Sequence, residues 1–400
     1  MTTTPLDLRP RDDRETRLLL ECARASIGPG RAARIRELAA GGLDWARVLK
    51  LAERNALRPL LYWHLNTICP ERVPADVFAF LRDYFQKNVA FNALLTGELL
   101  RLLTVLNERG IEAVAFKGPA IAVQLYGHIG LRQFCDLDIL VRPDDVWRAS
   151  GVLEEQGFGA KLRIPEERRA AFVRQDYART FHRDDGRTTV ELHWGIAERS
   201  FGVRFDADAV WRRRASMMLQ ARAVSVPSAE DLLLMLCVHG SRHGWDKLEG
   251  LCGIAELARR EDLDWPHVWR NAREMRCQRM LAFALWLAHG LLEAPLPREA
   301  AELGESRAFH AVVEDVVREF HVDDVPAPTL ARQMAVHLRL RDTYADCARY
   351  WAGLALTVTP DDWAAVRLPG PLSVGYPLVR AFRVARKHAV NQHHAAGGRP

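Results

Sequence analysis

Two aspartates alternate with apolar residues in the run Asp136-Leu-Asp-Ile-Leu-Val, and this pattern constrains the fold more than any other in the chain. A β-strand places residues i and i+2 on the same face, so Asp136 and Asp138 point one way while the aliphatic residues point into a core. Two carboxylates this close disfavour each other's ionised form, and a bound divalent cation relieves the repulsion. Oxygen ligands suit Mg²⁺, or Mn²⁺, so the run predicts a metal-binding strand.

A glycine turn lies upstream of this strand. Residues 112–116 are a candidate strand, and Lys117-Gly118-Pro119 and a short helical segment follow. Backbone N–H groups at a helix start attract phosphate, and Lys117 adds a positive charge there. The order of strand, turn and helix therefore predicts a phosphate-binding turn.

A later strand candidate supplies another carboxylate. Glu191 lies within 188–194 between apolar neighbours, and His193 shares its face. This segment follows the strand candidate 177–183 through the sequence Asp-Asp-Gly at 184–186, and Asp-Gly between alternating runs is a strong hairpin signal. We therefore expect a mixed sheet that is partly antiparallel.

Helical periodicity flanks this unit on both sides. Asp44 is a candidate N-cap, Gly110 stands where a helix C-cap glycine would, and a helical pattern returns after Phe205. The predicted fold class is α+β, with a small mixed β-sheet domain embedded between N-terminal and C-terminal helical regions. The expected divisions are 1–110 (helical), 111–205 (mixed α/β), 206–369 (helical) and 370–400 (a basic tail).

Composition narrows the class of protein. The net charge of +5, from 56 basic and 51 acidic residues, is too mild at this length to indicate a nucleic-acid partner. Seven scattered cysteines without a CxxC pair indicate reduced thiols and not a disulfide frame or a zinc site. The N-terminal residues lack the apolar core of a signal peptide, and no apolar run reaches the roughly 20 residues that span a bilayer. We expect a cytoplasmic protein without a membrane partner.

The acidic and basic residues together match one kind of chemistry. Phosphoryl or nucleotidyl transfer needs carboxylates that hold Mg²⁺ against a triphosphate, a third acidic group, and cations for the phosphates. Asp136 and Asp138 provide the pair and Glu191 the third carboxylate. Lys117 and Arg132 are the candidate cations. The sequence therefore predicts a site for an NTP.

The glycine turn, the D-x-D strand and the later carboxylate resemble the DNA polymerase β-type nucleotidyltransferase superfamily. The runs KGPAIAVQLYG, LRQFCDLDILV and VELHW, and a following helix with His239 and His243, are more closely similar to a bacterial family of largely uncharacterised nucleotidyltransferases. Members of that family often accompany gene clusters for ribosomally made peptides, lasso peptides among them. The resemblance covers about residues 15–300, with its motifs in 116–141 and 190–247.

The resemblance implies metal ligation by Asp136, Asp138 and Glu191, and nucleotide binding by Lys117 and Gly118. The superfamily turn is usually Gly-Ser or Gly-Gly, whereas this chain has Gly118-Pro119 and a longer gap before the aspartates. Pro119 has no N–H to donate, so the grip on phosphate must rest on other groups, for which Lys117 and Arg132 are candidates. The identity of the transferred group stays open.

Each of these residues also has a plainer interpretation. The three carboxylates, Lys117 and Arg132 could be solvated surface groups, and His193 a histidine at the edge of the core. His239 and His243 are four residues apart and share a helix face, but no third ligand accompanies them. A substrate contact in a cleft, with Lys247 nearby, therefore competes with a polar rim on a buried helix.

We expect an Mg²⁺-dependent enzyme that transfers a nucleotidyl group from an NTP to a hydroxyl of a small molecule or peptide. The alternatives are kinase-like phosphate transfer to a ribosomally made peptide, a toxin-type modifier of tRNA or protein, and a degenerate nucleotide-binding module that regulates a partner. The mild charge counts against the toxin. The complete carboxylate set counts against the degenerate module, although Pro119 keeps it open.

Overall fold

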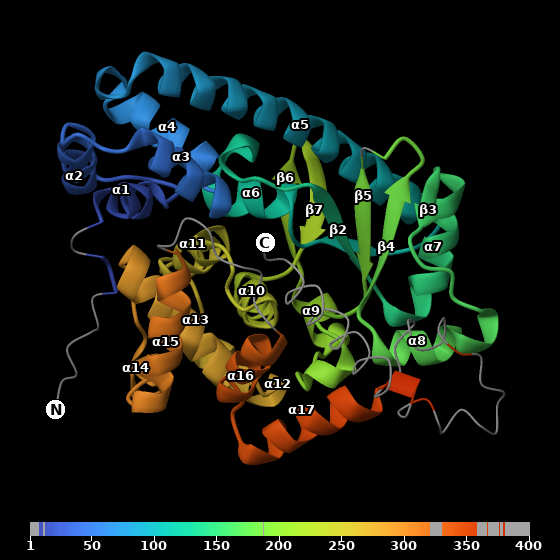
Figure 1. Cartoon of the computed structure of the whole chain (residues 1–400). Coiled ribbons are helices and arrows are strands. Elements are labelled where there is room, and N and C mark those ends of the chain that lie inside the picture. The colour runs from blue at the N-terminus through green and yellow to red at the C-terminus, as the bar shows by residue number, and fades with distance from the viewer. Residues whose placement is uncertain are drawn as a thin grey trace, which may run out of the picture.

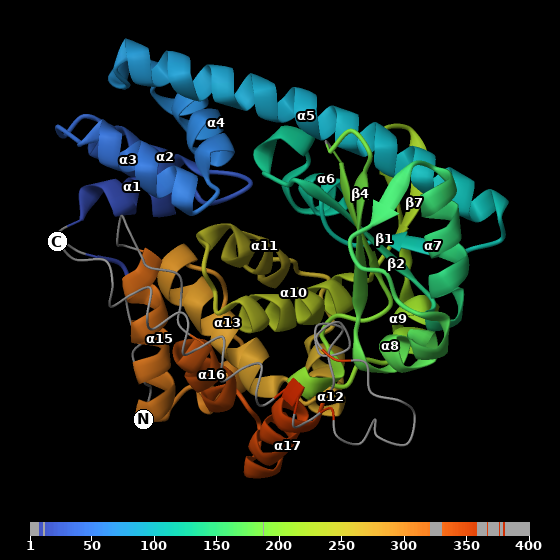
Figure 2. The same ribbon diagram turned by 45° about the vertical axis from the view of Figure 1, so that its right-hand side comes forward.

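The computed structural model describes residues 8–10, 13–186, 188–320 and 330–357, and the single positions 366, 376, 379 and 380. In Figure 1 the long helix α5 (Ala75–Glu108) spans the top of the molecule, above both the N-terminal helices and the sheet. The C-terminal helices lie below them, and Figure 2 shows the same layering after a rotation. The predicted basic tail at 370–400 lies almost wholly outside the described residues.

The N-terminal helices follow the predicted apolar periodicity. They are α1 (Arg14–Cys22), α2 (Pro29–Ala39), α3 (Trp45–Arg54), α4 (Arg58–Ile68) and α5, with a 3-10 turn at Pro70–Arg72. Asp44 caps α3 as predicted, because its carboxylate accepts the backbone N–H of Arg47 at 3.2 Å. Gly110 follows α5 with φ of 68°, a left-handed conformation that favours glycine after a helix.

Helix α5 is unusually long and apolar. It is the one helix in the described part of the chain that could cross a membrane by length and composition, with mean hydropathy 1.6 over a window that is 39% buried. A single helix of this kind is weak evidence for a span, because core helices pass the same test. Leu95, Leu99 and Leu102 of α5 are buried, and the helix packs against α4 and the sheet as a core helix does.

The predicted mixed sheet is confirmed. Its strands are β1 (Ala113–Ala115), β2 (Asp136–Val141), β3 (Phe158–Ala160), β4 (Ala178–Arg183) and β5 (Thr189–His193), in the order β1-β2-β5-β4-β3. Strands β2 and β5 are parallel, and the other neighbours are antiparallel, including the predicted β4–β5 hairpin. Helices α6 (Pro119–Tyr126), α7 (Val146–Glu155) and α8 (Arg169–Gln175), and 3-10 turns at Ile129–Leu131, Pro143–Asp145 and Glu166–Arg168, connect them.

The sequence pattern predicted helices from Phe205 onward, and this prediction is wrong for residues 215–226, which form two strands. A second hairpin forms from β6 (Ala215–Leu219) and β7 (Arg222–Val226), joined by two residues with positive φ, Gln220 and Ala221. The turn contains no glycine or asparagine, which is why the sequence gives no hairpin signal. The hairpin belongs to the sheet's side of the molecule, because Leu219 and Val226 share a hydrophobic cluster with Ile139 of β2.

The remaining elements are helical. A 3-10 turn at Arg199–Phe201 precedes α9 (Ala207–Arg213), and after the hairpin come α10 (Ala229–His243), α11 (Leu248–Ala258), α12 (Trp265–Met275), α13 (Gln278–Leu292), α14 (Arg298–Leu303), α15 (Arg307–Phe320), α16 (Leu330–Arg339) and α17 (Tyr344–Leu356). Ser228 caps α10 by accepting the backbone N–H of Asp231 at 3.2 Å. The fold class is α+β, with helical regions on both sides of the sheet. All seven cysteines are free thiols, and Cys135 is the exposed one.

Candidate active site

A pocket of about 730 Å³ lies where the sheet, the N-terminal helix α5 and the helices α10 and α11 meet. Nine of the ten predicted site residues line it: Lys117, Arg132, Asp136, Asp138, Glu191, His193, His239, His243 and Lys247. The tenth, Gly118, is not among the lining residues. The predicted residues lie on the sheet, on its connecting segments and on the α10–α11 region, and α5 adds a wall on which the sequence analysis named no residue.

The register of two parallel strands builds the floor of the pocket. Asp138 of β2 is opposite Glu191 of β5, and Leu140 is opposite His193. Because side chains alternate along a strand, Asp138, Glu191 and His193 emerge on one face of the sheet. The aliphatic residues between them are buried on the other face, which fixes this register.

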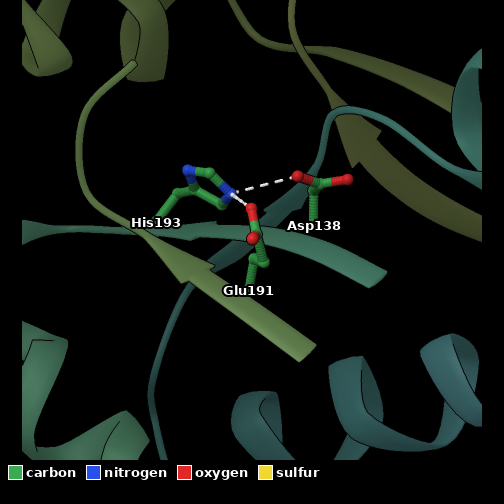
Figure 3. Close-up of side chains that lie close together, drawn as sticks. All are labelled: Asp138, Glu191 and His193. Carbon is green, nitrogen blue, oxygen red and sulfur yellow. Dashed lines mark hydrogen bonds and ion pairs between the residues drawn. The ribbon is translucent and has the colours of Figure 1, made fainter. Parts of the chain in front are cut away.

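Three side chains converge on this floor, as Figure 3 shows. The Nε2 atom of His193 lies 3.0 Å from Oδ1 of Asp138 and 3.2 Å from Oε2 of Glu191. A proton assigned to Nε2 is therefore donated to both carboxylates. The ligand atoms of the three residues all lie within 4.8 Å of one another, close enough to hold one metal ion.

A lysine joins the same group. The ammonium of Lys117 donates to Oδ1 of Asp138 at 2.9 Å, and the two side chains are only 12% and 3% exposed. Burial would raise the pKa of Asp138, but the charge of Lys117 and the hydrogen bond from His193 outweigh it and hold that pKa well below its usual range. Asp138 is therefore the ionised centre of the cluster.

Asp136 is on the same strand but outside the group of three. Its partner on β5 is Thr189, one pleat away from Glu191. Burial, and then the charges of Asp138 and Glu191, raise the pKa of Asp136 to about 6. The sequence predicted Asp136, Asp138 and Glu191 as ligands, and the structure brings His193 to the two nearer carboxylates.

Gly118 shapes the turn beside the floor. Its φ of 53° and ψ of −124° are strained for any residue with a side chain, and an added Cβ would lie 3.3 Å from the carbonyl oxygen of Asp136. Pro119 then starts α6, where its fixed φ suits the first helical turn. Gly118 is thus needed for the close approach of the turn to β2.

Arg132 lies in the pocket wall as an ion pair. Its guanidinium donates to the carboxylate of Glu249 on α11, with Nη2 3.4 Å from Oε2. Asn92 of α5 holds the backbone here, donating to the carbonyl oxygen of Arg132 at 2.8 Å, and Asn88 donates to that of Gly130 at 2.9 Å. The signal for these two asparagines was their i, i+4 spacing, which places both amides on one face of α5.

Residues 41–293 match the model of a protein family that is described as uncharacterised nucleotidyltransferase. The chain belongs to this nucleotidyltransferase family. The match includes every pocket-lining residue, from Ala56 to Gly253, whereas α14 to α17 lie outside it. A comparison with curated proteins gives no match. The family assignment supports a nucleotidyl-transfer role for the pocket.

Helix α10 brings to the pocket the two histidines that were predicted to share a helix face. The rings of His239 and His243, on α10, have centroids 4.5 Å apart. Burial, and then the charge of Lys117, lower the pKa of His239, and partial burial and Arg242 lower that of His243. Both rings are therefore neutral near pH 7. Lys247 is exposed at the mouth.

The residues on the floor fit a divalent cation. Asp136, Asp138 and Glu191 supply oxygen atoms on one face, and burial, followed by the charges of the other two carboxylates, raises the pKa of Asp136. Oxygen donors suit Mg²⁺, and an imidazole is better matched to Mn²⁺ and other transition metals. Asp138 and Glu191 would hold the ion, with Asp136 or His193 beside them.

Proposed function

We propose that this chain is an Mg²⁺-dependent nucleotidyltransferase that moves a nucleotidyl group from an NTP to a hydroxyl of a small molecule or peptide. The observation that carries the proposal is the pairing of Asp138 with Glu191 on adjacent parallel strands, at the floor of a 730 Å³ pocket. The family match covers the whole of that pocket. A pocket of this volume is within the range that binds small molecules and cofactors.

The residues of the floor would divide the work of the transfer. A bound cation would supply positive charge to the phosphate oxygens and to the departing pyrophosphate. The acceptor oxygen forms a bond to the α-phosphorus, the bond to the β-phosphate oxygen breaks, and pyrophosphate leaves. Glu191 accepts the proton of the acceptor hydroxyl, or completes the metal site. Lys117 and Arg132 offset charge on the phosphates.

The pocket's other walls suit the uncharged parts of the substrates. Tyr84 and Phe91 of α5 present rings to the pocket, and His239 and His243 present neutral imidazoles from α10. Aromatic faces stack on nucleobases and on apolar groups without sequence preference. The NTP base or the acceptor would therefore lie between α5 and α10.

The test is retention of label. The protein is incubated with each NTP labelled at the α- or γ-phosphate, Mg²⁺ and candidate hydroxyl acceptors, and the product is analysed by mass spectrometry. We expect the α-label and the mass of a nucleotide on the acceptor. Asp138→Asn should lower the transfer by about a thousandfold or more, while Asp144→Asn, at an exposed aspartate outside the pocket, should leave it unchanged. Transfer by Asp138→Asn within tenfold of wild type would refute the assignment.

Kinase-like phosphoryl transfer is the second candidate, and Pro119 is the observation that favours it. Proline at the start of α6 removes one N–H from the turn expected to hold phosphate, so the triphosphate can lie differently. In that case the γ-label and the mass of a phosphate are retained. A tRNA- or protein-modifying toxin and a degenerate regulatory module remain further proposals. Tight NTP binding without turnover would favour the module. A cytoplasmic location likewise stays a prediction.

A further inference from the structure

One oxygen of Asp138 faces two donors. Oδ1 of this carboxylate accepts the ammonium of Lys117 at 2.9 Å and faces Nε2 of His193 at 3.0 Å. A carboxylate oxygen offers about two lone pairs, so these two donors fill it. The structure thus holds its own counter-ions at the position where a divalent cation would bind.

A cation on Asp138 cannot leave Lys117 where it is. If the ion takes Oδ1, it displaces the ammonium directly. If the ion takes the other oxygen, a divalent and a monovalent positive charge remain within a few ångströms of each other in a largely buried site, and they repel. Both routes favour movement of the ammonium away from Asp138.

The released ammonium can move into the pocket. Lys117 lines the cavity, its side chain is already 12% exposed, and a lysine ends in a point charge on a flexible four-carbon stem. The turn that begins with Lys117 leads into α6, where the triphosphate is expected. An ammonium that leaves Asp138 can therefore contact phosphate with its three donors.

We propose that Lys117 exchanges partners during substrate binding, from the Asp138 carboxylate in the free protein to the nucleotide's triphosphate once a divalent cation is bound. This inference rests on the proposed function of the site. Lys117 is then a binding residue with two opposite effects. Its charge weakens the binding of the metal and strengthens the binding of the nucleotide. Metal and nucleotide should consequently strengthen each other's binding.

The first test follows the ammonium in the unmodified protein. An amine-acylating reagent is applied to the free protein, with Mn²⁺ alone, and with Mn²⁺ plus a non-hydrolysable ATP analogue, and acylation is read residue by residue by mass spectrometry. Acylation of Lys117 should be slow at first, rise about tenfold with Mn²⁺ alone, and fall again with the analogue. Lys161, exposed and outside the pocket lining, should be unchanged. A rate at Lys117 that Mn²⁺ leaves unchanged would overturn the exchange.

The second test separates the two roles by substitution. Lys117→Met keeps an unbranched side chain that is one atom shorter, and removes the charge. It should bind Mn²⁺ about tenfold more tightly without nucleotide, measured by electron paramagnetic resonance, and bind the ATP analogue about tenfold more weakly with Mn²⁺ present. Lys247→Met removes a pocket lysine for which no ion pair to Asp138 is described, and should not raise Mn²⁺ affinity. Weaker binding of both ligands by Lys117→Met would mean a merely structural role and refute the proposal.

Neither test measures turnover, so the proposed metal site and the proposed exchange of Lys117 can be refuted separately. If wild type and Lys117→Met both bind no Mn²⁺, with or without the ATP analogue, the metal site of the proposed function is wrong and the exchange falls with it. If both bind Mn²⁺ equally well, the metal site stands and only the exchange is wrong. If Lys117→Met does not fold, the acylation of wild-type Lys117 decides alone.

Discussion

Two partly buried charge clusters in this molecule both consist of closely spaced ion pairs, but they differ in net charge and in surroundings. The arginine cluster joins α1, α2 and the end of α13, and consists of Glu21, Glu293, Arg9, Arg31 and Arg34. The carboxylate cluster in the pocket consists of Asp136, Asp138, Glu191, Lys117 and His193. Both contain nearly inaccessible side chains, at Glu21 and Arg31 in the first and at Asp138 and His193 in the second.

The clusters differ in the sign of their surplus charge and in what lies beside them. Three arginines surround two glutamates in the first, so each carboxylate is satisfied and none of its members is among the described lining of the pocket. Three carboxylates face one lysine and one histidine in the second, beside a cavity of about 730 Å³. A buried charge is therefore not in itself a sign of function; a surplus of acid next to open space is.

The nearby histidines report the same difference. His64, close to Arg31, has its pKa lowered to about 4 by burial, although its hydrogen bond to the carbonyl oxygen of Arg24 opposes the shift. Burial would also lower the pKa of His193, but hydrogen bonds to Asp138 and Glu191 prevail and raise it. The two carboxylates therefore attract positive charge strongly enough to override burial at His193, whereas burial decides the pKa of His64.

The largest expected effect is on activity, at the centre of the carboxylate cluster. Asp138→Asn removes the one ligand that both Lys117 and His193 contact, and we expect transfer from labelled NTP to fall by about a thousandfold or more. Urea unfolding should show a smaller loss of stability than Glu21→Gln causes, because removing this charge also relieves repulsion from Asp136. Activity within tenfold of wild type would show that the cluster is structural.

The opposite outcome is expected in the arginine cluster. Glu21→Gln leaves three arginines with one carboxylate, and breaking such a buried arrangement should lower the free energy of unfolding by about 3 kcal/mol. The folded protein should keep kcat/KM within about twofold, because Glu21 is not among the residues that line the pocket. Urea denaturation and the labelled-NTP assay give both numbers. A loss of activity without a loss of stability would reverse our assignment of the two clusters.

The carboxylate cluster could be predicted from the sequence only in part. The shared face of Asp136 and Asp138 follows from strand periodicity, and so does that of Glu191 and His193. Strand β5 lies parallel beside β2, with Asp138 opposite Glu191. This pairing joins segments that are distant in sequence, so no local pattern predicts it. This register is what takes His193 into the cluster and leaves Asp136 one pleat away.

Other parts of the site depend on contacts between distant segments. Asn88 and Asn92 hold the backbone at Arg132 across some forty residues of chain, and Arg132 in turn pairs with Glu249. The turn residue Lys117 was predicted to bind phosphate, but its ion pair with Asp138 was not. The glycine-free β6–β7 hairpin was missed for a local reason, since Gln220 and Ala221 adopt positive φ without the residues that usually signal it.

The lowered pKa of His64 predicts that the stability of the protein falls in acid. The pKa of His64 is about 4 in the folded protein and near 6.5 in the unfolded chain, so the unfolded state takes up the proton first. The stabilisation from neutral His64 is complete above pH 6.5 and is lost as the pH falls towards 4, by about 3 kcal/mol in total. His64→Gln keeps an N–H donor for the carbonyl oxygen of Arg24 but cannot be protonated. Urea unfolding across this range should show the smaller acid loss in the variant, and equal slopes for both proteins would contradict the assignment.

The smallest expected effect is on the access of an alkylating reagent to cysteine. Each cluster has a cysteine next to one of its carboxylates in the sequence. Cys135 precedes Asp136, is exposed and lines the pocket, whereas Cys22 follows Glu21 and is buried. Burial, and then the charge of Asp136, raise the pKa of the Cys135 thiol, so alkylation should be slow at neutral pH and faster at mildly alkaline pH. Mn²⁺ with an ATP analogue should slow alkylation of Cys135 about tenfold by covering it, while Cys22 stays unreactive until the protein unfolds.

Peptide mass spectrometry separates the two thiols, and half-buried Cys347, outside the pocket lining, serves as the control for general reactivity. If the analogue left Cys135 as reactive as before, the nucleotide would bind somewhere other than above the carboxylate cluster.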